Sequence, residues 1–426
     1  MSLIGRSFLH ASDLHLGFPL GELKDCDQLS DENLKLIVKE MQGAFDNLIQ
    51  VAIDNNVLFV VLAGDIYHDL DSQDALQADF RNGLLKLEEH GIGAYIIHGN
   101  HDPSLKGYKP RRELPDNVHV FRTDEPHEFI AAQTDEGIVS VAGVSFGSNA
   151  VTENLTVGFR NLPRENAKWR VGVLHTSMAG NSAHDTYAPC SVEDLRAAPV
   201  GYWALGHIHL RNDNNSLGDG RWWAYSGNLQ GRNFKPAECH PKGALLVTLN
   251  RNGFDAPKFV ACDTVRFQNI QIDVSEIGEL DDCSRLLIKE VLKASNSLEN
   301  RRLVVRVELI GRSFLHKEIR TQVESGKMQK DFLGDFASEI GSTIVAGITS
   351  TVKPTYDLNE LRQEQGLIGT TLRILDQMSD EEVLTESKKL VVATASECLG
   401  DDDAIAIRER TAMALVEAIL EGNKKS

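Results

Sequence analysis

The chain has 426 residues, of which 42% are hydrophobic and 25% are charged, and its formal net charge at pH 7 is −18. Because a single hydrophobic core stops growing at roughly 250 to 300 residues, we expect two or three domains. The acidic balance argues against a protein that binds nucleic acid by overall charge alone, since such binding sets Lys and Arg against phosphates.

From residue 6 to about residue 263, short apolar runs alternate with segments of helical periodicity. The apolar runs predict buried strands at 7–11, 57–63, 94–97, 171–174 and 202–205. Residues 33–53 carry apolar side chains at three- and four-residue steps, which predicts one helix. This alternation indicates an α/β layered core, in which polar functional side chains collect where strands end.

The pattern changes near Asp263. A helix is predicted at 281–294, a strand at 303–309 and a further helix from about residue 315, which indicates a smaller second domain. Beyond residue 350, apolar residues at helical spacing predict helical segments joined by acidic loops, either a helical subdomain with its own core or a partner-binding region. We therefore expect domains at 1–264, 265–350 and 351–426.

An identical octapeptide, L-I-G-R-S-F-L-H, occupies residues 3–10 and residues 309–316. The first copy is followed by an Asp-x-His segment, whereas the second continues with Lys317 and Glu318. One repeated octapeptide does not support a repeat architecture.

Five polar segments lie at or just after the predicted strands. Singly, some have ordinary explanations, because Gly-Asp is common at turns and helix N-termini. Together they hold six of the 14 histidines at strand ends, which packing does not explain, so they predict a functional site. The segments are Asp13-Leu14-His15, Gly64-Asp65-Ile66-Tyr67-His68, Gly99-Asn100-His101-Asp102, His175 and Gly206-His207-Ile208-His209.

This set of donors fits hydrolysis of a phosphate ester by two metal ions, which such sites hold roughly 3.5 to 4 Å apart. An Asp-x-His segment aims two donors at one ion, and a lone carboxylate such as Asp65 bridges two ions. Mixed carboxylate, amide and imidazole ligands without thiolates suit Mn²⁺, Fe²⁺ or Zn²⁺. We expect two divalent ions, with Mn²⁺ as the first choice.

Other conspicuous residues have structural interpretations. His10 and His98 lie in or beside strands, and we interpret them as packed or hydrogen-bonded neighbours. Trp222, Trp223 and Tyr225 fit either base stacking or a core strand, and we favour the core strand.

The motif order D-x-H, G-D, G-N-H-D, H and G-H-x-H resembles the calcineurin-like metallophosphoesterase superfamily over residues 6 to about 250. His68 and residues 204–209 look like its DNA-repair exonuclease branch, the SbcD and YhaO type. The chain is similar to the same branch at four further places, which are residues 226–232, Glu238, Lys242-Gly243 and residues 311–316. The resemblance implies an α/β layered β-sandwich flanked by helices, with a smaller α+β capping domain and a helical C-terminal region.

The resemblance also implies a role for each site residue. One metal ion would be held by Asp13, His15, Asp65 and His209, and the other by Asp65, Asn100, His175 and His207. Asp65 would bridge the two ions. His101 would stabilise the phosphate and protonate the leaving oxygen, and His68 would help to place the scissile phosphate.

The resemblance implies a two-metal phosphodiesterase, a DNA exonuclease or endonuclease acting in DNA repair through attack by a metal-activated hydroxide. Its partners would be single- or double-stranded DNA, steered by residues 265–350, and an SMC-like ATPase subunit docked by residues 351–426. Two alternatives are a phosphodiesterase of nucleotides or small phosphate esters, and a non-hydrolytic subunit that anchors the ATPase. A homodimer and a monomer are both compatible with the sequence.

DNA binding by an acidic chain would depend on local basic clusters, although such runs are commonly solvated surface. The candidates are Lys106, Lys109, Arg111 and Arg112, and then Arg301, Arg302, Arg306, Arg312 and Arg320.

No stretch approaches the roughly 18 apolar residues of a membrane span, and Arg6 and residues 10–13 interrupt the apolar run that a secretory signal would need. The six cysteines form no C-x-x-C pair, so neither a disulfide framework nor a zinc knuckle is indicated. We expect a cytoplasmic protein with free thiols and no membrane contact.

Overall fold

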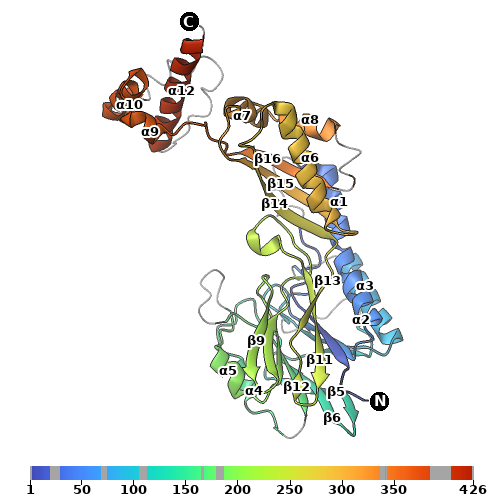
Figure 1. The fold of residues 1–426 in the computed structure, drawn as a ribbon. Coiled ribbons are helices and arrows are strands. Elements are labelled where there is room, and N and C mark those ends of the chain that lie inside the picture. The colour runs from blue at the N-terminus through green and yellow to red at the C-terminus, as the bar shows by residue number, and fades with distance from the viewer. Residues whose placement is uncertain are drawn as a thin grey trace. The chain divides into compact units, whose positions relative to one another are not determined.

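The computed structural model describes residues 2–19, 29–68, 74–104, 113–164, 167–178, 187–335, 341, 343–383 and 404–424 (Figure 1). The chain divides into two compact units. The first comprises Met1–Ile272, Ser284–Glu308 and Ser325–Thr349, and the second comprises Asp273–Cys283, Leu309–Glu324 and Ser350–Ser426. None of the described helices combines the length and the apolar character that a bilayer crossing needs.

A seven-stranded sheet forms one layer of the first unit, in the order β12-β11-β1-β2-β3-β4, with β13 beside β11. Strands β1 to β4 are parallel neighbours, whereas β11 runs antiparallel to β1. The loops that follow β1, β2 and β3 therefore meet at one edge of this sheet. The bounds are Ser7–Ala11 (β1), Phe59–Ala63 (β2), Gly93–Ile97 (β3), Val118–Val120 (β4), Gly243–Asn250 (β11), Gly253–Phe254 (β12) and Lys258–Ala261 (β13).

A six-stranded sheet forms the second layer, in the order β5-β6-β7-β8-β10-β9. Its four inner strands are parallel to their inner neighbours, and the edge strands β5 and β9 pair antiparallel. The bounds are His127–Thr134 (β5), Gly137–Gly143 (β6), Trp169–His175 (β7), Tyr202–Gly206 (β8), Asn212–Gly218 (β9) and Arg221–Tyr225 (β10). All five strands predicted before residue 263 are present, with ends shifted by at most two residues.

The two sheets pack face to face around large aromatic side chains. Phe8 of β1 stacks on Phe59 of β2 with 4.9 Å between ring centroids, and it meets Tyr202 of β8 edge-on at 5.3 Å. Trp169 of β7 is fully buried in the same cluster. Because both faces of the inner strands are covered, these strands are continuous apolar runs, which is why they are recognisable in the sequence.

Helices cover the outer faces of the sandwich. α2 (Gly43–Asp54) and α3 (Asp74–Glu89) bury apolar side chains such as Phe45 against the seven-stranded sheet. α4 (Thr156–Phe159) and α5 (Val192–Ala197) pack beside the six-stranded sheet. The first unit thus contains a layered β-sandwich flanked by helices, which confirms the predicted fold class.

The single helix predicted at 33–53 is wrong, because two helices occupy these residues. α1 (Asp31–Met41) ends before Gln42, and α2 begins at Gly43. Ile37 of α1 packs in a cluster with residues of a third sheet, whereas Phe45 of α2 packs on the seven-stranded sheet. Gln42, the one residue between the two helices, keeps helical backbone angles, with φ −62° and ψ −28°.

The third sheet is three-stranded, in the order β14-β15-β16. Its strands are Val265–Asp273 (β14), Arg302–Ile310 (β15) and Ile344–Ser350 (β16), and its neighbouring helices are α6 (Leu280–Asn296) and α8 (Lys327–Asp335). Figure 1 shows α6 lying across this sheet. The strand and helices expected after Asp263 are therefore present.

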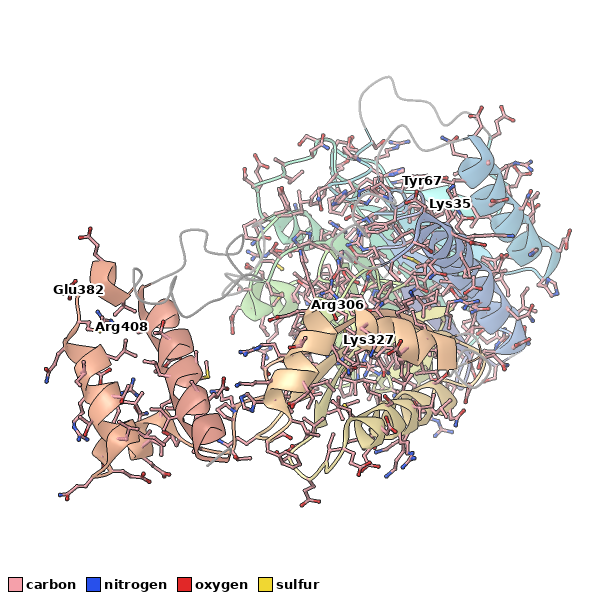
Figure 2. The ribbon with its side chains drawn as sticks, turned by 90° about the horizontal axis from the view of Figure 1, so that it is seen from above. Lys35, Tyr67, Arg306, Lys327, Glu382 and Arg408 are labelled. Carbon is pink, nitrogen blue, oxygen red and sulfur yellow. The ribbon has the colours of Figure 1, made fainter. Side chains whose placement is uncertain are left out.

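The second unit contains the helices α7 (His316–Glu324), α9 (Leu358–Gln363), α10 (Leu367–Gln377) and α12 (Ala404–Lys424). Leu372 and Leu375 of α10 pack against Ala412 and Val416 of α12, so this helical region has an apolar cluster of its own. Arg408 of α12 donates hydrogen bonds to the carbonyl oxygens of Leu375 and Met378 at 2.8 and 2.7 Å (Figure 2). A helical C-terminal region is confirmed.

Candidate metal centre

The polar segments lie at the carboxyl ends of strands in both layers of the sandwich. Asp13 and His15 follow β1, Asp65 follows β2, and Asn100 and His101 follow β3. His175 ends β7, and His207 and His209 follow β8. Parallel strands within each sheet place these loops at a common edge, so the structure brings all nine predicted site residues, His68 included, into one region of the first unit.

The backbone at these strand ends adopts left-handed conformations that side chains other than glycine rarely take. The φ angles are 52° at Asp13, 46° at His15, 52° at Asp65 and 98° at His207. Such strain persists where the surrounding structure over-determines the conformation, which is common at functional sites. Gly99 is required for a steric reason, because a Cβ at this position would overlap the carboxylate of Asp65.

The first group of donors contains Asp13, His15 and His209, whose ligand atoms lie within 4.8 Å of one another. The Nε2 atoms of the two histidines are 3.1 Å apart, and Nε2 of His209 is 3.8 Å from Oδ1 of Asp13. A carboxylate and two imidazoles that converge in this way fit one divalent cation.

The second group contains Asp13, Asp65 and His175. Nε2 of His175 lies 3.5 Å from Oδ2 of Asp65 and 3.0 Å from Oδ1 of Asn100. The same Oδ2 of Asp65 is 3.8 Å from Nε2 of His15, so Asp65 lies between the two groups. The His207 ring is 5.3 Å from the His175 ring between centroids.

The electrostatics of the second group also fit a cation. Burial opposes protonation of His175, but the Asp65 carboxylate outweighs it and raises the pKa of His175 to about 9. Burial would raise the pKa of Asp65, yet His175 and the backbone N–H of His101 hold this pKa below its usual range. This pair therefore keeps a positive charge beside a buried carboxylate, and a divalent ion held by Asp65 and His175 would supply such a charge.

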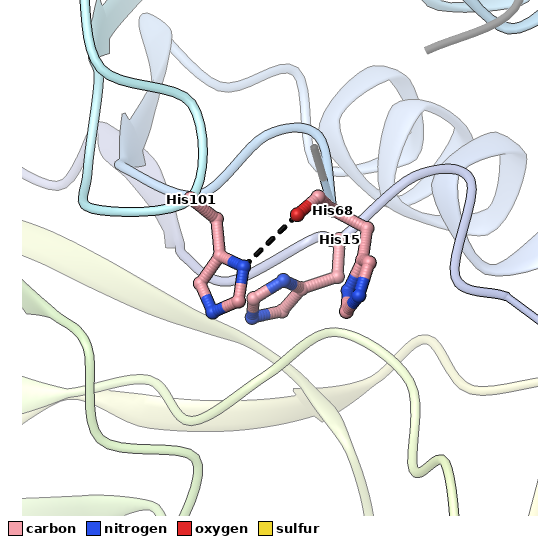
Figure 3. A group of neighbouring side chains, drawn as sticks. All are labelled: His15, His68 and His101. Carbon is pink, nitrogen blue, oxygen red and sulfur yellow. Dashed lines mark hydrogen bonds between the residues drawn. The ribbon is translucent and has the colours of Figure 1, made fainter. Parts of the chain in front are cut away.

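A third group contains His15, His68 and His101 (Figure 3), and it shares His15 with the first group. Nδ1 of His101 is 2.9 Å from the backbone carbonyl oxygen of His68. A carbonyl oxygen only accepts hydrogen bonds, so Nδ1 of His101 carries the hydrogen and donates it. This contact orients the ring and leaves Nε2 of His101 available for another partner.

Neighbouring polar groups orient the ligand side chains. Ser12 donates to Oδ2 of Asp13 at 2.6 Å, and the backbone N–H of His207 donates to the same oxygen at 3.0 Å. Asp102 accepts from the backbone N–H groups of Ile66 and Gly99, both at 2.8 Å, and so joins the loops that carry Asp65 and Asn100. Nothing in the residue pattern assigned these roles to Ser12 and Asp102, because they depend on contacts between distant segments.

Glu238 is the buried carboxylate behind His209. It ends a 3₁₀ helix (Pro236–Glu238), and its Oε1 accepts from Nδ1 of His209 at 2.9 Å. Burial opposes ionisation of Glu238, but the hydrogen bond and charge of His209, with Arg232 and Lys242 nearby, lower its pKa to about 2. With Nδ1 donating to a carboxylate, His209 presents Nε2 to the first group, an arrangement typical of histidines that bind metals. Only the resemblance drew attention to Glu238.

The structural interpretations of His10, His98 and the aromatic strand are confirmed. Nδ1 of His10 is 3.0 Å from the Tyr202 hydroxyl, and Nε2 is 3.2 Å from the carbonyl oxygen of Leu205. Nδ1 of His98 lies 3.4 Å from Asp102. Trp223 and Tyr225 are buried in the core of the six-stranded sheet.

Most described members of the predicted basic clusters have partners within the protein. Arg301 pairs with Asp263 at 2.8 Å, Arg302 pairs with Glu40 at 2.5 Å, and Arg306 lies over the Phe234 ring. In the second unit, Arg312 pairs with Asp357 at 3.2 Å, and Arg320 is exposed. Lys106, Lys109, Arg111 and Arg112 lie outside the described residues.

Comparison with known families finds two matches along the chain. Residues 6–211 match the calcineurin-like phosphoesterase family, and residues 267–337 match the middle domain of metallophosphoesterase YhaO. Residues 6–211 therefore form a domain of the calcineurin-like phosphoesterase family. The clustered Asp and His side chains of this metallophosphoesterase fit a dinuclear metal site.

Curated relatives include an uncharacterised metallophosphoesterase, YhaO of Bacillus subtilis, which is 32% identical over 63% of this chain and 64% of its own length. The DNA double-strand break repair protein Mre11 of Thermoplasma acidophilum is 25% identical over 47% of this chain and 51% of its own length. The Mre11 protein of Methanocaldococcus jannaschii is 22% identical over 78% of this chain and 90% of its own length. The chain thus spans less than two thirds of the first two relatives, and it is similar to both YhaO and Mre11 proteins.

Proposed function

We propose that this metallophosphoesterase hydrolyses phosphodiester bonds in DNA, as an exonuclease or endonuclease of DNA repair. The observation that carries the proposal is the position of His101, whose Nδ1 donates to the His68 carbonyl while its ring lies 4.8 Å from the ring of His15. A proton donor beside a two-metal donor set suits cleavage of a phosphate ester. The DNA-repair names of the Mre11 relatives support DNA as the substrate.

In this proposal Asp13, His15, Asp65 and His209 hold one divalent ion, and Asp65, Asn100, His175 and His207 hold the other, with Mn²⁺ as the native metal. When bound, the two ions lower the pKa of a water molecule and so supply the attacking hydroxide. Asp65 would be a ligand of both ions, because its Oδ2 lies 3.8 Å from Nε2 of His15 and 3.5 Å from Nε2 of His175.

The protein's own residues then orient the substrate and move one proton. His101 keeps its Nδ1 hydrogen on the His68 carbonyl and delivers a proton from Nε2 to the leaving oxygen. The His68 ring, 5.2 Å from the His101 ring, helps to place the scissile phosphate. Ser12 and the backbone N–H of His207 hold the Asp13 carboxylate in its orientation.

The region after the nuclease domain supports further proposals. We place a domain boundary at 264/265 and another at 350/351, with a capping domain that steers DNA and a C-terminal region that docks an SMC-like ATPase. Leu367 and Ile374 of α10 are 67% and 56% exposed, which suits a surface that binds another protein. A cytoplasmic location belongs to the same proposal.

A small phosphodiester is the second candidate substrate. The net charge of −18 and the internal ion pairs of Arg301, Arg302 and Arg312 leave less free positive surface for a DNA backbone. With such a substrate the same residues would act in the same roles, and the capping domain would not be needed to steer it.

The test measures hydrolysis of end-labelled duplex and single-stranded DNA and of bis(p-nitrophenyl) phosphate, each with Mn²⁺ and with a chelator. Wild type and His101→Ala are compared. DNA degradation that requires both Mn²⁺ and His101 is the expected result. Cleavage of the small diester alone would contradict DNA as the substrate and favour the second candidate, and no cleavage of either would contradict phosphodiester hydrolysis.

A further inference from the structure

Arg232 is a largely buried cation beside the first donor group. Its side chain is 12% exposed, and one terminal nitrogen lies 3.0 Å from Nδ1 of His209. Its guanidinium carbon is 4.9 Å from the centroid of the Phe18 ring. The backbone N–H of Arg232 donates to Oε2 of Glu238 at 3.2 Å, which fixes where the side chain starts.

Glu238 lies near the guanidinium without using its hydrogen-bond donors. Oε1 of Glu238 is 3.6 Å from a terminal guanidinium nitrogen of Arg232, and the same oxygen accepts from Nδ1 of His209 at 2.9 Å. Because Nδ1 of His209 carries a hydrogen in that contact, it is no acceptor for Arg232. Glu238 therefore offsets the charge of Arg232 but leaves its N–H groups available.

One donor of Arg232 lacks any hydrogen-bond partner in the described part of the chain. Nε is buried and without an acceptor. Buried polar groups are nearly always hydrogen-bonded, and charged ones are the most costly to leave unpaired, so Nε needs an acceptor that the described residues do not supply.

Arg232 lines the same pocket as a member of the first donor group. The pocket is lined by Arg232, His15 and Phe18, together with side chains of α1 and Gln230. A molecule that fills this pocket lies against both Arg232 and His15. Guanidinium groups match phosphate oxygens in charge and in their paired N–H geometry.

We propose that Arg232 binds a phosphate oxygen of the substrate beside the first metal ion, with Glu238 as its positioning residue. This inference rests on the proposed hydrolysis of phosphodiesters at this site. The phosphate is either the scissile group or its neighbour along the nucleotide chain. Arg232 is then a specificity-determining residue, because it adds an anion contact that the metal ligands do not provide.

The direct test is calorimetric titration of inorganic phosphate into the Mn²⁺-loaded full chain, for wild type, Arg232→Gln and Arg232→Lys. Loss of one charge-assisted hydrogen bond should weaken phosphate binding roughly 10- to 100-fold in Arg232→Gln. The phosphate affinity of Arg232→Lys should lie between those of wild type and Arg232→Gln. Metal content should stay at the wild-type value in both variants. Unchanged phosphate affinity in Arg232→Gln would overturn the proposal.

A matched control removes the same charge from a neighbouring surface position. Arg211 is paired with Asp213 at 3.2 Å and stacks on the Phe259 ring at 3.9 Å. Arg211→Gln should alter phosphate affinity by no more than about twofold, because an exposed charge is screened. An equal loss in both variants, or metal loss that parallels the affinity loss in Arg232→Gln, would mean that Arg232 acts by long-range charge or through His209, and would also overturn the proposal.

Two further ligands identify which phosphate is bound. Bis(p-nitrophenyl) phosphate contains only the scissile group, whereas thymidine 3′,5′-bisphosphate, used as an inhibitor of its hydrolysis, contains two. A higher KM for the diester in Arg232→Gln assigns the scissile phosphate to Arg232. A higher Ki for the bisphosphate with an unchanged KM for the diester assigns the neighbouring phosphate. If phosphate binding depends on Arg232 but no DNA is cut, the nuclease proposal fails and the role of Arg232 stands. Normal DNA cleavage with unchanged phosphate affinity in Arg232→Gln would support the nuclease proposal and remove Arg232 from phosphate binding.

Discussion

His15 and His209 bring their Nε2 atoms to 3.1 Å although 194 positions separate them in the chain. Each ring comes from a different layer of the sandwich, since His15 follows β1 and His209 follows β8. Asp13 and Asp65 lie at 3.8 Å from His209 and His15, respectively. The ends of strands from the two sheets, and not any local turn, therefore bring these candidate metal ligands together.

Asp65→Ala should lose both metal ions. The carboxylate lies between the two donor groups, so its removal takes a ligand from each and leaves His175 without its counter-charge. Metal stoichiometry after dialysis, measured by plasma emission spectrometry, checks this. Glu128→Gln is the control, because it alters a carboxylate that pairs with Arg170 outside the site. Normal metal content in Asp65→Ala would contradict the bridging role.

Glu238→Ala should weaken metal binding at the first group by about 10- to 100-fold, the usual cost of losing a carboxylate behind a metal-binding histidine. The metal affinity of Glu238→Gln should lie between those of wild type and Glu238→Ala. The carboxylate accepts from His209 on one oxygen and from Asn228 on the other, whereas an amide offers only one acceptor oxygen. Competition with a metal-indicator dye measures the affinity.

The control for Glu238 is Glu40→Gln, which alters an ion pair with Arg302 instead of a contact with a ligand. Equal metal affinity in Glu238→Ala and wild type would remove Glu238 from the set of positioning residues.

The sequence predicted the α/β layered core and the ligand loops because both depend on local signals, whereas the β-sandwich was implied by the family resemblance. Inner strands are apolar on both faces, and the motif residues come directly after them, so chain order alone brings Asp65 and Asn100 to one edge. The break between α1 and α2 left no such signal. Gln42 keeps helical backbone angles, and Ile37 and Phe45 continue one helical spacing in the sequence although they pack in different clusters.

The orienting residues were hidden for a similar reason. Glu238 reaches His209 across 29 positions, and Ser12 gains its role from contacts with Ser226 as well as from its neighbour Asp13. A serine or glutamate gives the same sequence signal whether it is exposed or hydrogen-bonded to a ligand. Tertiary contacts decide between these cases, so the sequence could predict the ligands more fully than the groups that orient them.

The repeated octapeptide provides a matched pair for a stability test. Phe8 in the first copy is fully buried between the two sheets, whereas Phe314 in the second copy is 63% exposed, between β15 and α7. Phe8→Ala should lower the free energy of unfolding by roughly 3 to 5 kcal/mol, because it leaves a cavity among aromatic rings. Phe314→Ala should change it by no more than about 0.5 kcal/mol.

Urea denaturation, followed by tryptophan fluorescence, measures both variants. Since the two phenylalanines have identical neighbours in sequence, any difference reports their environment alone. Similar free energies of unfolding for the two variants would contradict the burial of Phe8.

His10 should make the protein less stable in acid. Burial lowers the pKa of His10 to about 3, from a value of 6.5 when it is exposed. Above pH 6.5 neither the folded nor the unfolded chain binds this proton, so His10 contributes no pH dependence there. Between pH 6.5 and about 3 the unfolded chain binds a proton that the folded chain does not, so the free energy of unfolding decreases as the pH falls.

The contribution of His10 approaches about 1.4 kcal/mol per pH unit in the middle of that range. His10→Asn removes the titrating ring and should flatten the dependence of unfolding free energy on pH between 6 and 4 by about that slope. The substitution also loses the contacts with Tyr202 and Leu205, which lowers stability at every pH, so slopes and not absolute values are compared. Parallel slopes in wild type and variant would show that His10 is protonated equally in the folded and unfolded chain.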